Sequence, residues 1–194
     1  MDDERATFGR TRRRAKPLDR TRMEELALAY VARFATSTGK LRAYLQRKLR
    51  ERGFVEAETP DIEALVCKFV EKGYVDDAAY GRAKANDLAA RGYGARRVEQ
   101  TLRSAGIEEN LRDALQPEEE QKRQSALVLA RKRRFGPFGP VPGVNAEEEY
   151  KMREKQLAAM VRAGHDFAIA RYVVEARTAE ELELWVTEVT DETG

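Results

Sequence analysis

Hydrophobic residues recur with helical spacing along most of this chain. The spacing is clearest between residues 62 and 70, where the apolar positions are Ile62, Leu65, Val66, Phe69 and Val70. These positions follow i, i+3, i+4, i+7 and i+8, which predicts an amphipathic helix. Thr59 is expected to be its N-cap and Pro60 its first helical residue, and Gly73 lies where a helix-ending glycine is common.

Similar apolar stripes predict helices before and after this one, so the expected fold is all-α. A helix from about 117 to 134 begins with three glutamates and ends with Arg131–Arg134, a charge order that complements the helix dipole. That order by itself can explain the basic cluster. The following segment, Phe135–Gly143, holds three prolines and three glycines and predicts a loop.

Three helix endings resemble one another: Leu49-Arg-Glu-Arg-Gly53-Phe54, Leu102-Arg-Ser-Ala-Gly106-Ile107 and Met160-Val-Arg-Ala-Gly164-His165. The glycines are 53 and 58 residues apart. In each ending, glycine can adopt the left-handed conformation that stops a helix, and the next side chain can fold back on the last turn. Glycine C-caps are also common in helical proteins, so chance similarity is the alternative.

The recurrence predicts an elongated tandem array of three three-helix repeats, with flexible basic N-terminal and acidic C-terminal tails. The expected segments are a basic arm at 1–22, repeats at 23–75, 76–116 and 117–177 with a loop at 135–146, and an acidic tail at 178–194. Residues 1–22 hold eight Lys/Arg against four Asp/Glu, and residues 178–194 hold six acids and no Lys or Arg. The basic arm suits either a polyanion contact or a solvated terminus.

The composition fits such an array. Charged residues make up 36% of the chain and the mean hydropathy is −0.68, so thin apolar stripes must hold the fold together. No run of eighteen apolar residues occurs, and the chain begins with charged residues, so we expect a cytoplasmic protein without a membrane segment. The single cysteine, Cys67, has no cysteine partner and is expected to be a buried structural thiol.

Three successive segments resemble signatures of the RecX family, which regulates the RecA recombinase. They are Leu45-Gln-Arg-Lys-Leu49-Arg-Glu-Arg-Gly53-Phe54, Gly73-Tyr-Val-Asp-Asp77-Ala-Ala-Tyr80 and Arg91-Gly-Tyr-Gly-Ala-Arg-Arg-Val98-Glu-Gln-Thr-Leu102-Arg-Ser-Ala-Gly106-Ile107. The resemblance covers about residues 26–176 and is strongest from 41 to 115. It fades in the third repeat, where His165 stands in place of the family's usual apolar residue, and in both tails.

The resemblance implies a non-enzymatic regulator without a cofactor. Such a protein binds RecA and its filament on DNA, and mainly inhibits the recombinase, ATPase and co-protease activities in DNA repair and the SOS response. We also expect weak direct DNA binding at most and a monomeric chain. The structural motif residues it implies are Leu49, Gly53, Phe54, Asp76, Asp77, Gly94, Leu102, Gly106, Ile107 and Gly164.

Two basic groups next to the motif glycines are the candidates for contact with RecA or DNA: Arg47, Lys48, Arg50 and Arg52, and then Arg91, Arg96, Arg97 and Arg103. Such side chains can pair with phosphates or with acidic protein surfaces. The alternative is a solvated face of local salt bridges with acids such as Glu51 and Glu99. Two other functions also remain open: a general DNA-binding helical protein that uses the basic arm and Arg131–Arg134, and a helical scaffold that docks another protein through the acidic tail and Trp185.

No residue pattern indicates catalysis or a metal site. His165 is the only histidine, and without a Ser, Cys or second His motif it is expected to be a helix-terminus residue. Asp76 and Asp77 are better explained as a helix cap than as metal ligands, which need further ligands at fixed offsets. Gly92-Tyr-Gly94 is expected to be a turn, because it is too short for a dinucleotide-binding motif and follows a helix.

Overall fold

The computed structural model describes residues 16–140 and 145–188, and these residues form an all-helical array. None of the helices in these ranges is long and apolar enough to cross a membrane. The helices are α1 (Arg20–Arg33), α2 (Thr38–Arg52), α3 (Ile62–Glu71), α4 (Asp77–Ala90), α5 (Ala95–Ser104), α6 (Glu109–Ala114), α7 (Glu119–Arg133), α8 (Ala146–Arg162), α9 (Phe167–Glu175) and α10 (Ala179–Thr187), with a short 3₁₀ turn, η1, at Gly136–Phe138.

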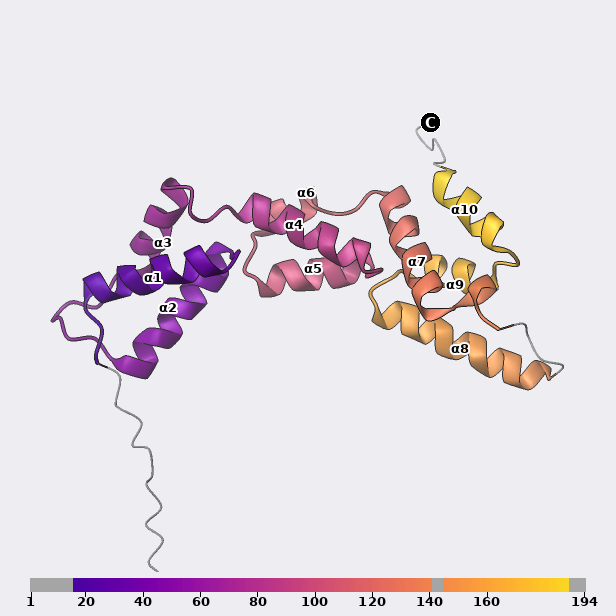
Figure 1. Ribbon diagram of the computed structural model, residues 1–194, viewed down its shortest axis with the longest axis horizontal. Helices are drawn as coiled ribbons and strands as arrows, with labels where there is room; N and C mark the ends of the chain where they lie inside the picture. The colour runs from indigo at the N-terminus through magenta and orange to yellow at the C-terminus, as the bar shows by residue number, and fades with distance from the viewer. Residues whose placement is uncertain (1–15, 141–144, 189–194) are drawn as a thin grey trace, which may run out of the picture.

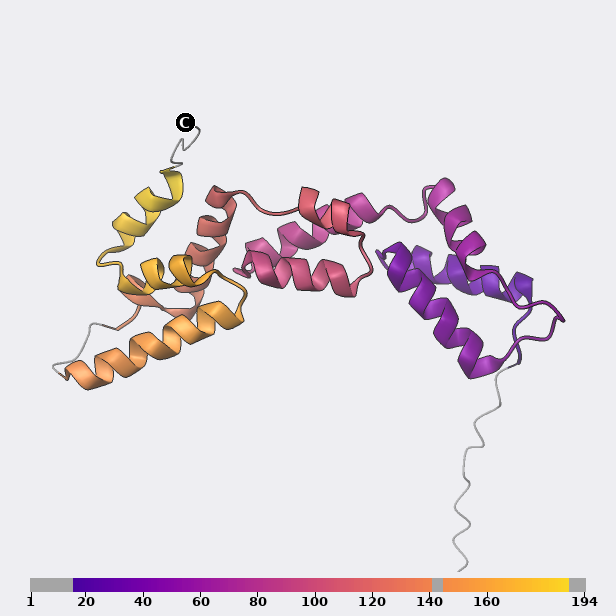
Figure 2. The same ribbon diagram turned by 180° about the vertical axis from the view of Figure 1, so that it is seen from behind.

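The helices form three groups that follow one another along an elongated molecule, α1–α3, α4–α6 and α7–α10 (Figure 1). Each group has its own hydrophobic cluster, centred on Leu41 and Phe69 in the first, on Leu102 and Ile107 in the second and on Met160 and Val173 in the third. The same arrangement is visible from behind in Figure 2. The predicted all-α array of three-helix repeats is confirmed, and α10 adds a fourth helix to the last group.

The start of α3 differs from the prediction. Asp61 is the N-cap, and its carboxylate accepts a hydrogen bond from the Ala64 amide at 2.9 Å. Thr59 and Pro60 therefore precede the helix. Aspartate is a stronger N-cap than threonine, which accounts for the later start.

The expectation that Cys67 is buried was also wrong, because the residue is exposed. Helix α3 packs mainly against α2, and this contact buries only the narrow stripe of Val66 and Phe69. Cys67 is one residue away from that stripe, about 100° around the helix. Val70, at the edge of the predicted apolar face, is 44% exposed for the same reason.

Both predicted tails include residues that pack in the described structure. Leu18 is fully buried, its backbone forms a parallel bridge with Phe54, and α1 begins at Arg20, so residues 16–22 are not a flexible arm. Helix α10 buries Leu182 and Val186 in the third cluster, so residues 179–187 are not a free acidic tail. The apolar side chains of these segments explain their docking. The rest of the predicted tails, 1–15 and 189–194, lies outside the described residues.

Part of the predicted Pro/Gly-rich loop is also ordered against the third repeat. Phe135 and Phe138 pack on its hydrophobic cluster, and the Gly136 amide donates to the side chain of Gln156 at 2.9 Å. Residues 141–144 of the loop lie outside the described residues. Helix α8 begins at Ala146, with Asn145 as its N-cap.

The glycine-ended helices close as predicted, with φ angles of 75° at Gly53, 74° at Gly106 and 98° at Gly164. The side chain after the glycine folds back and is buried in the second and third copies, at Ile107 and His165. Gly106 and Gly164 also have a role that the sequence did not reveal: each touches the first turn of the middle helix of the preceding repeat.

At the first joint, the beginning of α2 meets the end of α5. The Ser37 hydroxyl donates to the Ala105 carbonyl at 2.5 Å, and a Cβ on Gly39 would lie 2.7 Å from the Gly106 Cα. Asp77 of α4 accepts hydrogen bonds from the amide and hydroxyl of Thr38. These contacts join repeats one and two with backbone packed directly on backbone.

At the second joint, the beginning of α5 meets the end of α8 in the same manner. The Gly94 amide donates to the Ala163 carbonyl at 3.0 Å, and the Arg96 amide donates to the Gly164 carbonyl at 3.1 Å. A Cβ on Gly94 would overlap the Gly164 carbonyl group. The two joints thus use equivalent helix ends, which is how one repeat is stacked on the next.

Candidate partner-binding surface

The first predicted basic group lies on the last turns of α2, at the outer end of repeat one. Arg47 and Lys48 both pair with Glu51, at 3.7 and 2.7 Å. Arg52 donates to the carbonyl of Lys16 at 2.8 Å, so it holds the chain segment that leads into α1. Arg50 is exposed and has no ion pair among the described residues. Part of this group is therefore used inside the fold, and part faces solvent.

The second predicted group gathers around Tyr93, in the turn between α4 and α5. The guanidinium carbons of Arg91 and Arg97 lie 5.5 and 5.9 Å from the centre of the Tyr93 ring, which is close enough for cation–π attraction. Arg96 pairs with Asp166 at 3.3 Å across the joint between repeats two and three. The tertiary structure thus assembles three of the predicted arginines next to that joint.

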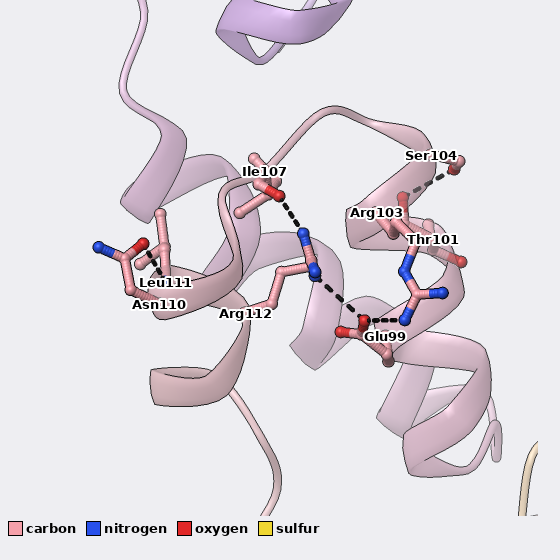
Figure 3. A network of polar contacts seen from close by, with 8 residues as sticks. All are labelled: Glu99, Thr101, Arg103, Ser104, Ile107, Asn110, Leu111 and Arg112. Atoms are coloured by element: carbon pink, nitrogen blue, oxygen red, sulfur yellow. Dashed lines mark hydrogen bonds and ion pairs between the residues drawn. The ribbon is translucent and has the colours of Figure 1, made fainter.

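Arg103 lies at the other end of α5, within a polar network drawn in Figure 3. It binds Glu99 at 2.7 Å, and Arg112 of α6 binds the same Glu99 oxygen at 3.0 Å and the Ile107 carbonyl at 2.6 Å. Burial opposes ionisation of Glu99, but the hydrogen bond from Arg103 and the charge of Arg112 hold its pKa below the ordinary value. Arg112 fastens α6 to α5, whereas Arg103 remains 68% exposed and accessible to a partner.

The predicted residues therefore do not form one continuous patch. The α2 group lies at the outer end of repeat one, while the arginines around Tyr93 lie at the joint of repeats two and three (Figure 1). Arg103 is close to the joint of repeats one and two. Most of the ion pairs in these groups are exposed, so they stabilise the fold by at most about 1 kcal/mol each and can be exchanged for contacts with a partner.

Three further basic residues were missed as members of this site. Lys132, Arg133 and Arg162 line a cavity of about 330 Å³ together with Arg91 and Tyr93. The sequence showed the charge cluster at the end of α7, but helix-dipole complementarity explained it locally. Nothing in the local pattern indicated that Arg162, some thirty residues later, lies at the same place.

The residues weighed for catalysis or metal binding have structural roles here. Asp76 caps α4 by accepting from the Ala79 amide at 2.8 Å. His165 is 2% exposed, and its Nε2–H donates to the Gly92 carbonyl at 3.0 Å. Burial lowers the pKa of His165 below its ordinary value. His165 is thus a helix-terminus residue, as predicted, and it fastens repeat three to repeat two.

Comparison with known proteins gives a consistent result. A family model described as RecX, second three-helix domain, matches residues 76–115, the segment that forms α4–α6. The regulatory protein RecX of Myxococcus xanthus is 34% identical over 175 residues, which cover 86% of this chain and 91% of that protein. The regulatory protein RecX of Thermus thermophilus is 37% identical over 108 residues, 56% of this chain and 71% of that protein.

A third relative, the regulatory protein RecX of a Mycobacterium species, is 29% identical over 166 residues. These cover 82% of this chain and 86% of that protein. The matches to the Myxococcus and Mycobacterium proteins cover 86% and 82% of this chain, so they extend well beyond the central repeat. On this evidence the chain belongs to the RecX family of regulatory proteins.

Proposed function

We propose that this protein binds the RecA recombinase on its DNA filament and limits strand exchange, together with the linked ATPase and co-protease activities. Membership of a family of regulatory proteins gives the class of function. The observation that carries the proposal is that Arg91, Arg96 and Arg97 of the central repeat lie together next to the second joint. An elongated array with charges on one repeat after another suits an extended nucleoprotein partner.

The role of the arginines follows from their chemistry. Guanidinium groups bind carboxylates and phosphates with two parallel hydrogen bonds, so they can contact acidic patches of RecA or the DNA backbone. Arg91 and Arg97 are held near Tyr93, so less side-chain freedom is lost when a partner binds. The exposed Arg103 and Arg50 extend the contact toward and onto repeat one.

The test is a titration of the full chain into RecA filaments on single-stranded DNA while ATP hydrolysis is followed. We expect inhibition at ratios well below one chain per RecA, and weak binding to naked DNA. Tight, salt-sensitive binding to naked DNA without an effect on RecA would instead identify a general DNA-binding protein. Indifference to both would identify a scaffold for another partner and would refute the proposal.

The site is tested with a triple variant, Arg91→Ala, Arg96→Ala and Arg97→Ala. A matched control removes the same charge from the exposed side of α8, with Lys151→Ala, Arg153→Ala and Lys155→Ala. We expect the first variant to need at least about tenfold more protein for half-inhibition, because the loss of one charge-assisted bond, worth about 1.5–3 kcal/mol, already accounts for that factor. The control should inhibit like the wild type. Equal inhibition by both variants would refute the site, provided that circular dichroism shows unchanged helical content.

A further inference from the structure

The cavity beside Tyr93 lies where three helices end. Arg91 is the C-cap of α4, Lys132 and Arg133 belong to the last turn of α7, and Arg162 is the last residue of α8. Repeat two therefore contributes one basic side chain to the cavity, and repeat three contributes three. Tyr93 and Phe135 contribute aromatic surface to its wall.

The charge around this cavity is one-sided. No aspartate or glutamate lines it. Arg91 has one acidic partner, Asp87 at 3.4 Å, and within the part of the chain that the structure describes Lys132, Arg133 and Arg162 have no ion pair. Elsewhere in this protein, basic residues on helix surfaces commonly have an acid three or four positions away, as Arg103, Lys151 and Arg153 do. Three cations without an ion pair in the described structure thus lie together at one hollow of the surface.

Neutralisation of helix dipoles accounts for only part of this charge. Each helix end contributes about half a negative charge, so three ends contribute about one and a half against four formal positive charges. The final carbonyls also have backbone partners already, since the Phe135 amide donates to the Ala130 carbonyl and the Gly164 amide to the Val161 carbonyl. A net positive field therefore remains in the cavity, and field lines are concentrated in a recess with apolar walls.

We propose that this cavity binds a small polyphosphate anion, of the kind carried by a nucleotide. Its volume of about 330 Å³ admits a chain of phosphate groups but not a duplex. Arginine side chains bind phosphate oxygens with paired hydrogen bonds, and lysine adds a point charge. Tyr93 and Phe135 offer apolar surface to an organic group attached to the phosphates. A bound anion bridges Arg91 of repeat two and the basic residues of repeat three, so it stiffens the joint.

This inference does not depend on RecA binding, and the variants that test it leave Arg91, Arg96 and Arg97 in place. The experiment is calorimetric titration of the full chain at low salt with inorganic tripolyphosphate, with ATP and with a single-stranded oligonucleotide. The test variant is Lys132→Gln, Arg133→Gln and Arg162→Gln. The matched control, Lys151→Gln, Arg153→Gln and Lys155→Gln, removes the same three positive charges from the exposed side of α8.

We expect the wild type and the control to bind tripolyphosphate and ATP, and the test variant to bind at least about tenfold more weakly, because one lost charge-assisted bond already accounts for about that factor. Arg162→Lys keeps the charge but loses the paired geometry, so an intermediate affinity is expected. Tighter binding of ATP than of tripolyphosphate would support contact with Tyr93 and Phe135. The proposal is overturned if the wild type binds neither small anion, if the control loses as much affinity as the test variant, or if only the oligonucleotide binds.

Discussion

Gly94→Ala is expected to loosen the joint between repeats two and three. Gly94 has a φ of −80°, which alanine adopts without strain, so the substitution acts through its added Cβ alone. That atom would overlap the Gly164 carbonyl group and the His165 amide, which are backbone atoms and cannot rotate away. Repeat three must therefore move back from α5.

The cost can be worked out from the contacts that this movement breaks. Two backbone hydrogen bonds cross the joint, from Gly94 to Ala163 and from Arg96 to Gly164, and the bond from His165 to Gly92 is a third. At a net value of about 1 kcal/mol each, their loss costs about 3 kcal/mol. Relief of the overlap by a smaller shift would cost about 1–3 kcal/mol instead. We therefore expect the free energy of unfolding to fall by about 1–3 kcal/mol.

Urea unfolding measured with two probes tests this expectation. Trp185, the only tryptophan, packs in repeat three, so its fluorescence follows that repeat, while circular dichroism follows all the helices. In the wild type the intact joint should make the two transitions coincide, and in Gly94→Ala they should separate because the repeats are uncoupled. Hydrogen exchange at the Arg96 amide should become faster.

Gly53→Ala is the matched control. Nothing lies within 4 Å of a Cβ at Gly53, but its φ of 75° is unfavourable for alanine, at a cost of about 1–3 kcal/mol. The total loss of stability is thus similar, but it falls on repeat one, and exchange at Arg96 should stay slow. The reasoning is refuted if Gly94→Ala unfolds within about 0.5 kcal/mol of the wild type with unchanged protection of the Arg96 amide.

Three further predictions concern the other contacts. In Gly39→Ala, helix α2 gains helix propensity worth up to about 1 kcal/mol, but the added Cβ would lie 2.6 Å from the Ala105 carbonyl oxygen. We expect a net loss of about 1–2 kcal/mol in the free energy of unfolding, measured with urea, and a stabilised variant would contradict the tight first joint. Arg112→Met should cost about 1–3 kcal/mol, because it leaves the half-buried Glu99 without its partner in α6. Arg103→Met should cost less than about 1 kcal/mol, because Arg103 is exposed, and equal melting temperatures of the two variants would contradict this ranking. For His165, the pKa in the folded protein lies below the unfolded value of about 6.5, so the unfolded chain binds the proton first and stability falls as the pH drops below about 6.5. His165→Gln should flatten this pH dependence of the free energy of unfolding, measured by urea titrations between about pH 7 and 5.5. An unchanged slope of stability against pH would exclude His165 as its source.

The helices and their glycine endings could be predicted from the sequence because the signals are local. The stripe of Val66 and Phe69 repeats with the helical period, and glycine at position 53, 106 or 164 ends a helix whatever lies beyond it. The order of three such units, with spacings of 53 and 58 residues, was sufficient for the tandem array. The predicted arginines of the central repeat could be named for the same reason, since they flank the motif glycines.

Other features depended on contacts between distant segments. Cys67 is exposed because α3 packs mainly against α2 and turns this residue away from the cluster. Helix α10 is docked because repeat three offers its leucine and valine a core. The terminal charge patterns gave no sign of this, because a solvated tail and the polar face of a packed helix have similar compositions.

The sequence by itself therefore determined the helices, their glycine endings and the repeat, because each is set by interactions within a few residues. Only the tertiary structure decided what the motif glycines touch. Gly92 and His165 are 73 positions apart yet share a hydrogen bond, and Gly94 and Gly164 meet because neither has a side chain to hold the backbones apart. The same packing brings Arg91 beside Lys132, Arg133 and Arg162. Helix periodicity fixes the direction of a side chain relative to its own axis, but the partner of that side chain depends on how the repeats stack.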